Sequence, residues 1–133
     1  NTLYTISNGG SLWKTILGSG SWTLLNQGFR FDQRNMQAFI KSGGGTRILA
    51  AIGQNMMYSD NEGATFTPVA GISFPVAWGG NYVAKIIRLR DAGNTVYCLT
   101  RLWSAVPWGP RFWLYRSTDQ GQSFTKIHEF TIG

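Results

Sequence analysis

The chain has 133 residues, 43% hydrophobic and 14% aromatic, which is enough for one packed domain and too apolar for a disordered segment. Its net charge of +6 comes from scattered residues, the densest cluster being Lys85, Arg88 and Arg90, so solvated strand ends explain it better than a nucleic-acid surface. No apolar run is long enough for a membrane-spanning helix, and Cys98, the one cysteine, cannot form a disulfide within the chain.

Short β-branched and aromatic runs, separated by many of the 17 glycines, predict an all-β fold. Three predicted strands precede residue 27, four lie between residues 36 and 70, and four lie between residues 82 and 130. In chain order they are Thr2–Ser7, Ser11–Leu17, Ser21–Asn26, Met36–Lys41, Thr46–Ile52, Asn55–Ser59, Thr65–Ala70, Tyr82–Arg90, Thr95–Leu102, Arg111–Ser117 and Ser123–Phe130.

The hairpin between the last two predicted strands carries a spaced motif. Within it, Asp119 can accept backbone N–H bonds, Gly121 can adopt a positive φ, and the aromatic ring can be buried at the start of the returning strand. We interpret it as a structural clip with no catalytic role. Its fixed positions are Ser117, Asp119, Gly121, Ser123 and Phe124.

The same motif recurs earlier in the chain, so the sequence contains an internal repeat. The second copy differs only at its acidic position, where Asn61 keeps a carbonyl oxygen that can accept the same turn bonds. Its positions are Ser59, Asn61, Gly63, Thr65 and Phe66.

A third, degraded copy lies in the hairpin between the second and third predicted strands. Thr15, Ser21 and Trp22 keep their places, whereas Leu17 replaces the Asp and Ser19 replaces the Gly. Because Gly18 and Gly20 flank the changed position, we still expect a turn there.

The pattern Ser/Thr-x-Asp-x-Gly-x-Ser/Thr-aromatic resembles the Asp-box, or BNR repeat, of the sialidase-like β-propellers. That resemblance implies four-stranded antiparallel blades with the box between the third and fourth strands. We therefore expect residues 1–133 to form a single β-propeller segment of about three blades. The first (1–28) lacks its innermost strand, and the others span 29–71 and 72–133.

A propeller typically closes with four to eight blades, so three blades would leave apolar faces and strand edges uncovered. We expect the remainder of a longer chain to complete the ring, in preference to sister copies or other subunits. A different β fold that carries the same motif is a further alternative.

Asp-box propellers bind ligands on the face opposite the boxes. In this chain that face would consist of the loops Gln27–Asn35, Gly71–Asn81 and Leu102–Pro110, which are rich in aromatic residues and arginine. Indole platforms beside guanidinium donors suit sugar or peptide recognition, although such rings can also pack between blades. Trp103 and Trp108 are the strongest candidates in the predicted ligand-binding set of Arg30, Asp32, Arg34, Trp78, Trp103, Trp108 and Arg111.

A glycosidase requires two facing carboxylates, and only Asp32 lies in the predicted ligand loops. The Phe/Tyr-Arg-Ile-Pro element of sialidases has a partial counterpart in residues 29–32. With His128 as the single histidine and no cysteine pair, we expect neither a metal site nor a cofactor.

These patterns favour a non-catalytic recognition module outside the cytoplasm, extracellular or periplasmic, that binds a glycan or a protein through its aromatic loop face. One alternative is a segment of a glycoside hydrolase, sialidase-like or of another Asp-box type. Another is a scaffold or assembly protein within a larger complex.

Overall fold

The computed structural model of the chain describes residues 1–7, 10–27, 31–52, 55–72, 82–88, 93–105 and 108–131. These residues form three antiparallel sheets and contain no helix, which confirms the predicted all-β class and the grouping of three, four and four strands. Sheet 1 contains β1 (Thr2–Ile6), β2 (Leu12–Ile16) and β3 (Thr23–Asn26).

Sheets 2 and 3 have four strands each, numbered in chain order across the sheet. Sheet 2 contains β4 (Phe31–Ile40), β5 (Thr46–Ile52), β6 (Asn55–Ser59) and β7 (Thr67–Pro68). Sheet 3 contains β8 (Tyr82–Arg88), β9 (Val96–Ala105), β10 (Trp108–Ser117) and β11 (Thr125–Thr131). β4 lies against β8, and β1 lies against β4.

The two hydrophobic cores lie on opposite faces of sheet 2. Because side chains alternate along a strand, β5 contributes Leu49 and Ala51 to the core shared with sheet 3, and Ile48 and Ala50 to the core shared with sheet 1. All four are at most 1% exposed. The middle sheet is therefore packed on both faces.

The core between sheets 2 and 3 also holds Cys98. Burial raises the pKa of its thiol to about 12, so at neutral pH the group is a protonated, weakly polar core side chain. Met56 lies in the same core.

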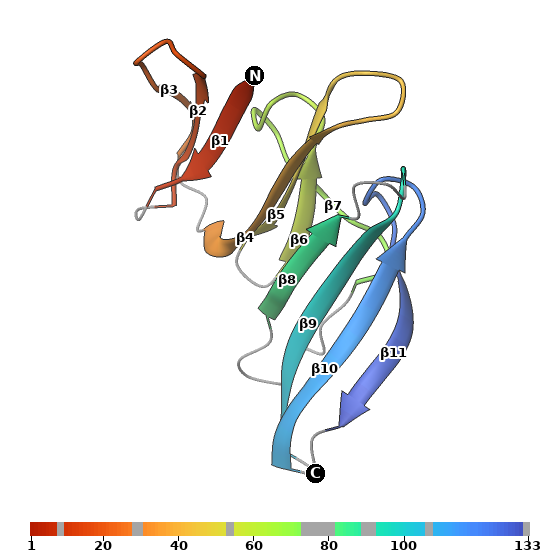
Figure 1. The fold of residues 1–133 in the computed structure, drawn as a ribbon. Coiled ribbons are helices and arrows are strands. Elements are labelled where there is room, and N and C mark those ends of the chain that lie inside the picture. The colour runs from red at the N-terminus through yellow and green to blue at the C-terminus, as the bar shows by residue number, and fades with distance from the viewer. Residues whose placement is uncertain are drawn as a thin grey trace.

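The three hairpins that carry the motif lie at one end of the sheets, at the top of Figure 1. The end of β9 and the start of β10 lie at the opposite end of sheet 3, at the bottom of Figure 1. This arrangement separates the motif hairpins from the strand ends that carry Trp103 and Trp108.

Candidate functional site: the motif turns and the β9–β10 ribbon

The motif turn of sheet 3 is closed by the side chains predicted to close it. Ser117 Oγ accepts the Gly121 N–H at 2.8 Å and donates to Asp119 Oδ1 at 2.7 Å. Asp119 Oδ1 also accepts the N–H groups of Gln122 and Ser123 at 3.1 and 2.9 Å, and Asp119 Oδ2 accepts the Ser123 hydroxyl. Burial favours the neutral acid, but these hydrogen bonds outweigh it and lower the pKa of Asp119.

The turn of sheet 2 forms the same bonds with an amide in place of the carboxylate. Ser59 Oγ accepts the Gly63 N–H at 2.8 Å and donates to Asn61 Oδ1 at 2.9 Å, while Asn61 Oδ1 accepts the Thr65 N–H at 2.9 Å. The bond between the two motif side chains has the opposite direction in the two turns. In sheet 3 the Ser123 hydroxyl donates to Asp119, whereas in sheet 2 Asn61 Nδ2 donates to Thr65 Oγ1 at 2.8 Å. The substitution of Asn for Asp therefore preserves the geometry and removes the charge.

Each of these turns also packs against the preceding sheet. Gly63 has φ 89° and Gly121 has φ 86°, and a Cβ at either glycine would overlap a leucine of that sheet. The overlap would be with Leu12 Cδ2 at 2.2 Å for Gly63, and with Leu49 Cδ1 at 2.6 Å for Gly121. Both positions require glycine for two reasons: the backbone has a positive φ, and the neighbouring leucine leaves no room for a Cβ atom.

The residue before each glycine also has a positive φ and bonds back to the preceding sheet. Glu62, at φ 57°, contacts Lys14 Nζ at 2.5 Å and the hydroxyl of Tyr4 at 3.5 Å. Gln120, at φ 60°, accepts the Ser42 N–H at 2.8 Å. The motif turns thus connect neighbouring sheets as well as closing their own hairpins.

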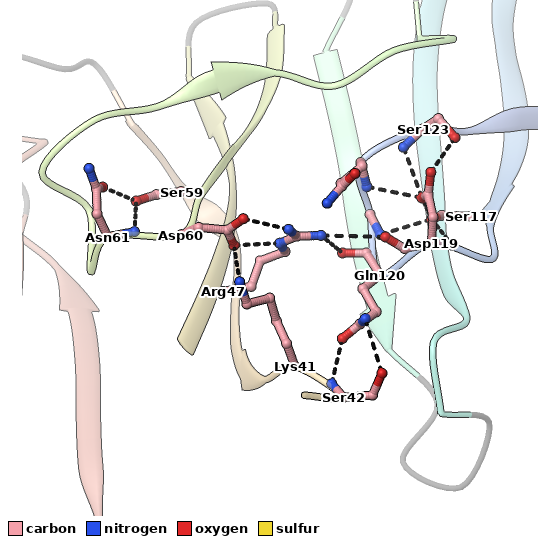
Figure 2. A network of polar contacts seen from close by, with 12 residues as sticks. Lys41, Ser42, Arg47, Ser59, Asp60, Asn61, Ser117, Asp119, Gln120 and Ser123 are labelled. Carbon is pink, nitrogen blue, oxygen red and sulfur yellow. Dashed lines mark hydrogen bonds and ion pairs between the residues drawn. The ribbon is translucent and has the colours of Figure 1, made fainter. Parts of the chain in front are cut away.

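Arg47 of β5 is the most deeply buried charged residue among the described side chains, at 1% exposure. It forms a two-point ion pair with Asp60, at 2.8 and 2.6 Å, and donates to the Gln120 carbonyl at 3.0 Å (Figure 2). Tyr58 lies under its guanidinium at 4.8 Å from the ring centroid, and Lys41 also approaches Asp60. The hydrogen bonds from Arg47 are the largest influence that lowers the pKa of Asp60.

Arg47 is not among the functional residues predicted from the sequence. Its position after Gly43, Gly44 and Gly45, at the start of an apolar strand, is the one available signal. A charged residue that begins an apolar run suggests a buried ion pair, but it does not identify the partner.

The degraded copy in sheet 1 forms a turn by other means. Thr15 Oγ1 donates to the Ser21 carbonyl at 2.6 Å, and Gly18 and Gly20 both have positive φ, as expected. Trp22, at the position of the buried Phe124, is 51% exposed. Among the described residues, no sheet precedes sheet 1 to cover that ring.

At the other end of sheet 3, β9 and β10 extend beyond their neighbours. β8 pairs with β9 only as far as Arg101, and β11 pairs with β10 only as far as Arg111. Beyond these points Leu102–Ala105 and Trp108–Pro110 pair with each other and with no other described strand. We call this two-stranded segment, residues 102–105 and 108–110, the ribbon; it projects below sheet 3 in Figure 1.

The ribbon corrects the prediction of a loop over Leu102–Pro110. Trp103 pairs with Pro110, and Ala105 pairs with Trp108. Paired residues of neighbouring strands belong to the same face of a sheet, and so do residues two apart along one strand. Position 103 therefore shares a face with position 105, and position 105 shares it with its partner, position 108. Pro110 suggested a loop, but proline is compatible with a strand that lacks a neighbour on one side.

The other predicted ligand residues are only partly placed. Arg30 and Trp78 lie outside the described residues. Asp32 and Arg34 lie within β4, which corrects the predicted loop over Gln27–Asn35. The polar residues of this segment indicated a loop. Instead β4 continues through the segment, with a register shift between Phe31 and Met36, and pairs Phe31 with Ile52 of β5.

Arg111, where the ribbon meets sheet 3, belongs to a charged and aromatic cluster that the sequence did not indicate. Its guanidinium contacts Glu129 at 3.1 Å, and Lys126 contacts the same carboxylate at 3.3 Å. Lys126 also lies 4.3 Å from the centre of the Trp113 ring. Partial desolvation favours the neutral form of Glu129, but hydrogen bonds from Trp113 and Lys126 and the nearby positive charges outweigh it and lower its pKa.

Every acidic side chain that the structure describes is engaged by a partner, and the pKa values of Asp60, Asp119 and Glu129 are lowered, whereas a general acid needs a raised one. The four acids are Asp60, Glu62, Asp119 and Glu129. In this part of the chain no group of three or more His, Cys, Asp or Glu residues is arranged to hold a metal ion. The same residues include no helix with the length and apolar character to cross a membrane.

Comparison with known proteins finds no matching family model and no curated protein similar to this chain.

Proposed function

We propose that the chain is a non-catalytic recognition module that works outside the cytoplasm and binds a glycan or a protein through the ribbon. The observation that carries this proposal is the position of Trp103 and Trp108 on one face of a ribbon that extends beyond both neighbouring strands. Aromatic side chains on a projecting strand pair can form a flat apolar platform for a sugar ring or an aromatic anchor for a protein partner.

We further propose that the three sheets are consecutive blades of a larger Asp-box β-propeller. Three features support this reading: the four-stranded antiparallel sheets, the motif turn between the third and fourth strands of each of sheets 2 and 3, and the uniform direction in which each turn contacts the preceding sheet. The rest of the ring would come from a longer chain or from other subunits.

The glycoside hydrolase alternative has less support. The acids with described side chains are bound to basic residues or to turn amides, as set out above. A retaining or inverting mechanism requires two carboxylates across the sugar, one of them able to donate a proton.

The recognition proposal predicts that replacing both Trp103 and Trp108 with alanine abolishes retention on immobilised polysaccharides and capture of a stoichiometric protein partner. The melting temperature should stay within a few degrees of the parent value. Trp22→Ala is the matched control, because Trp22 is 51% exposed and lies between β2 and β3, outside the ribbon. Unchanged retention in the double variant, or equal loss in the control, would refute the assignment of the ribbon as the binding surface.

A further inference from the structure

Strands β9 and β10 extend further than their counterparts in sheet 2. Ile48 of β5 and Val96 of β9 both pair with the serine of the motif, so the two strands can be aligned from these residues. The end of β5 at Ile52 then corresponds to Thr100, whereas β9 continues to Ala105. Among the described residues, those that sheet 3 contributes to the core shared with sheet 2 lie outside the ribbon. The ribbon therefore extends past the region in which these two sheets pack together.

The face of the ribbon that holds the two tryptophans continues onto the pair of residues at the ribbon's base. Alternation along each strand and pairing across the ladder define this face, which we call the tryptophan face. By register, its positions hold Arg101, Trp103, Ala105, Trp108, Pro110 and Phe112. Arg101 is the one charged residue of this set, and the others are aromatic or aliphatic. The set contains no carboxylate, amide or hydroxyl side chain, so the face combines a cation with an apolar surface.

Arg111, which the sequence grouped with the two tryptophans, belongs to the opposite face. It directly precedes Phe112, so alternation along β10 places it on the other side of the sheet. Its guanidinium is bound to Glu129 at 3.1 Å, and Glu129 pairs with Trp113 on that same opposite face. The cation of the tryptophan face is therefore Arg101 and not Arg111.

The chemistry of the tryptophan face suits a protein better than a sugar. The hydroxyl groups of a sugar need acceptors as well as donors, and a guanidinium has N–H donors only. Aromatic residues and arginine are, by contrast, enriched at the centres of protein interfaces. A carboxylate is the natural partner of a guanidinium, because two parallel N–H bonds match its two oxygens. The face therefore favours a protein segment in which apolar side chains surround an aspartate or a glutamate.

We propose that the partner of the ribbon is an acidic protein segment, and that Arg101 selects it by binding a carboxylate. Trp103 and Trp108 supply the apolar contact, and Arg101 determines which apolar segments bind. The inference rests on the proposed function, which leaves a glycan and a protein as alternatives for the same site. It narrows them to a protein and adds a residue, Arg101, that the sequence did not indicate.

A phage-displayed library of random peptides, selected on the whole chain, supplies the probe. The selected peptides should carry aspartate or glutamate among apolar residues, and synthetic copies should lose binding to the double variant of Trp103→Ala and Trp108→Ala. Peptides that bind this double variant as tightly as the parent would refute the ribbon as the site, and with it both proposals. Retention of the parent on a polysaccharide through the two tryptophans, with no peptide selected, would overturn this inference alone.

Arg101→Gln should weaken the binding of a selected peptide about tenfold, measured by fluorescence anisotropy, because it removes a charge-assisted pair. Arg111→Gln is the matched control on the opposite face and should bind as the parent does. Changing the acid of the peptide to its amide should weaken binding to the parent equally and leave binding to the Arg101→Gln variant unchanged. A misfolded variant would not give that coupling. If the two losses add, or if Arg101→Gln binds as the parent does, Arg101 does not select the partner and the inference is wrong.

Discussion

Gly121 of the β10–β11 turn and Leu49 of β5 are in such close contact that a Cβ on the glycine would lie 2.6 Å from the leucine Cδ1. The same arrangement joins Gly63 to Leu12, one sheet earlier. The positive φ of each turn would by itself favour glycine at these positions. In this protein they also determine how closely one sheet approaches the next.

Replacing Gly121 with alanine should therefore cost more than the positive φ alone. The strained backbone accounts for about 1–2 kcal/mol, and the overlap with Leu49 adds about 1–3 kcal/mol to the loss of unfolding free energy. Gly18→Ala is the control, because Gly18 has φ 90° with no atom within 4 Å of the added Cβ. Urea unfolding of both variants measures the difference, and equal losses would mean that the contact contributes nothing.

The second prediction concerns Asp119. Asp119→Asn should cost less than about 1 kcal/mol, because Asn61 shows that an amide forms the same turn bonds. Asp119→Ala should cost about 2 kcal/mol or more, since it leaves the N–H groups of Gln122 and Ser123 without their acceptor. Urea unfolding ranks the two variants, and a cost for the asparagine variant as large as that for alanine would show that the charge, rather than the geometry, closes the turn.

The third prediction concerns Arg47. Arg47→Met should lower the free energy of unfolding by about 1–3 kcal/mol, because the Gln120 carbonyl loses its donor, whereas Asp60 is partly solvated and keeps Lys41 as a partner. Arg47→Lys should have an intermediate cost, since an ammonium cannot reproduce the two-point pairing. Thermal and urea unfolding measure both. A methionine variant as stable as the parent would show that the ion pair is replaceable by apolar packing.

The fourth prediction is a pH dependence. Because the folded-state pKa of Asp119 is lowered, its contribution to stability is complete above the ordinary value of 3.8 and is lost as the pH falls through the folded-state value. Asp60 acts in the same direction. Unfolding free energies measured from about pH 7 to about pH 3 should therefore fall at the acid end, and less steeply for Asp119→Asn. An identical slope for parent and variant would contradict the role of the turn carboxylate.

The sequence predicted the strands well because its signals for them are local. Alternating apolar residues and glycine turns located all eleven strands, and the motif spacing predicted the backbone N–H bonds that Asp119 and Asn61 accept. The extended ladder of β9 and β10 was missed because Pro107, Gly109 and Pro110 are typical of a loop in sequence, whereas cross-strand pairing maintains the strand. Arg47 and its partners were missed because Asp60 and Gln120 lie far away in the sequence, and no local pattern records such a contact.

The most direct test of the account is a double-mutant cycle between Gly121→Ala and Leu49→Ala. Leu49→Ala removes the atoms that the new Cβ would overlap, so the cost of Gly121→Ala should be lower by about 1–3 kcal/mol in that background than in the parent. That result would establish the turn as a contact between sheets. If the two costs add without coupling, the motif turn closes its own hairpin only, and the proposed connection between neighbouring sheets is wrong.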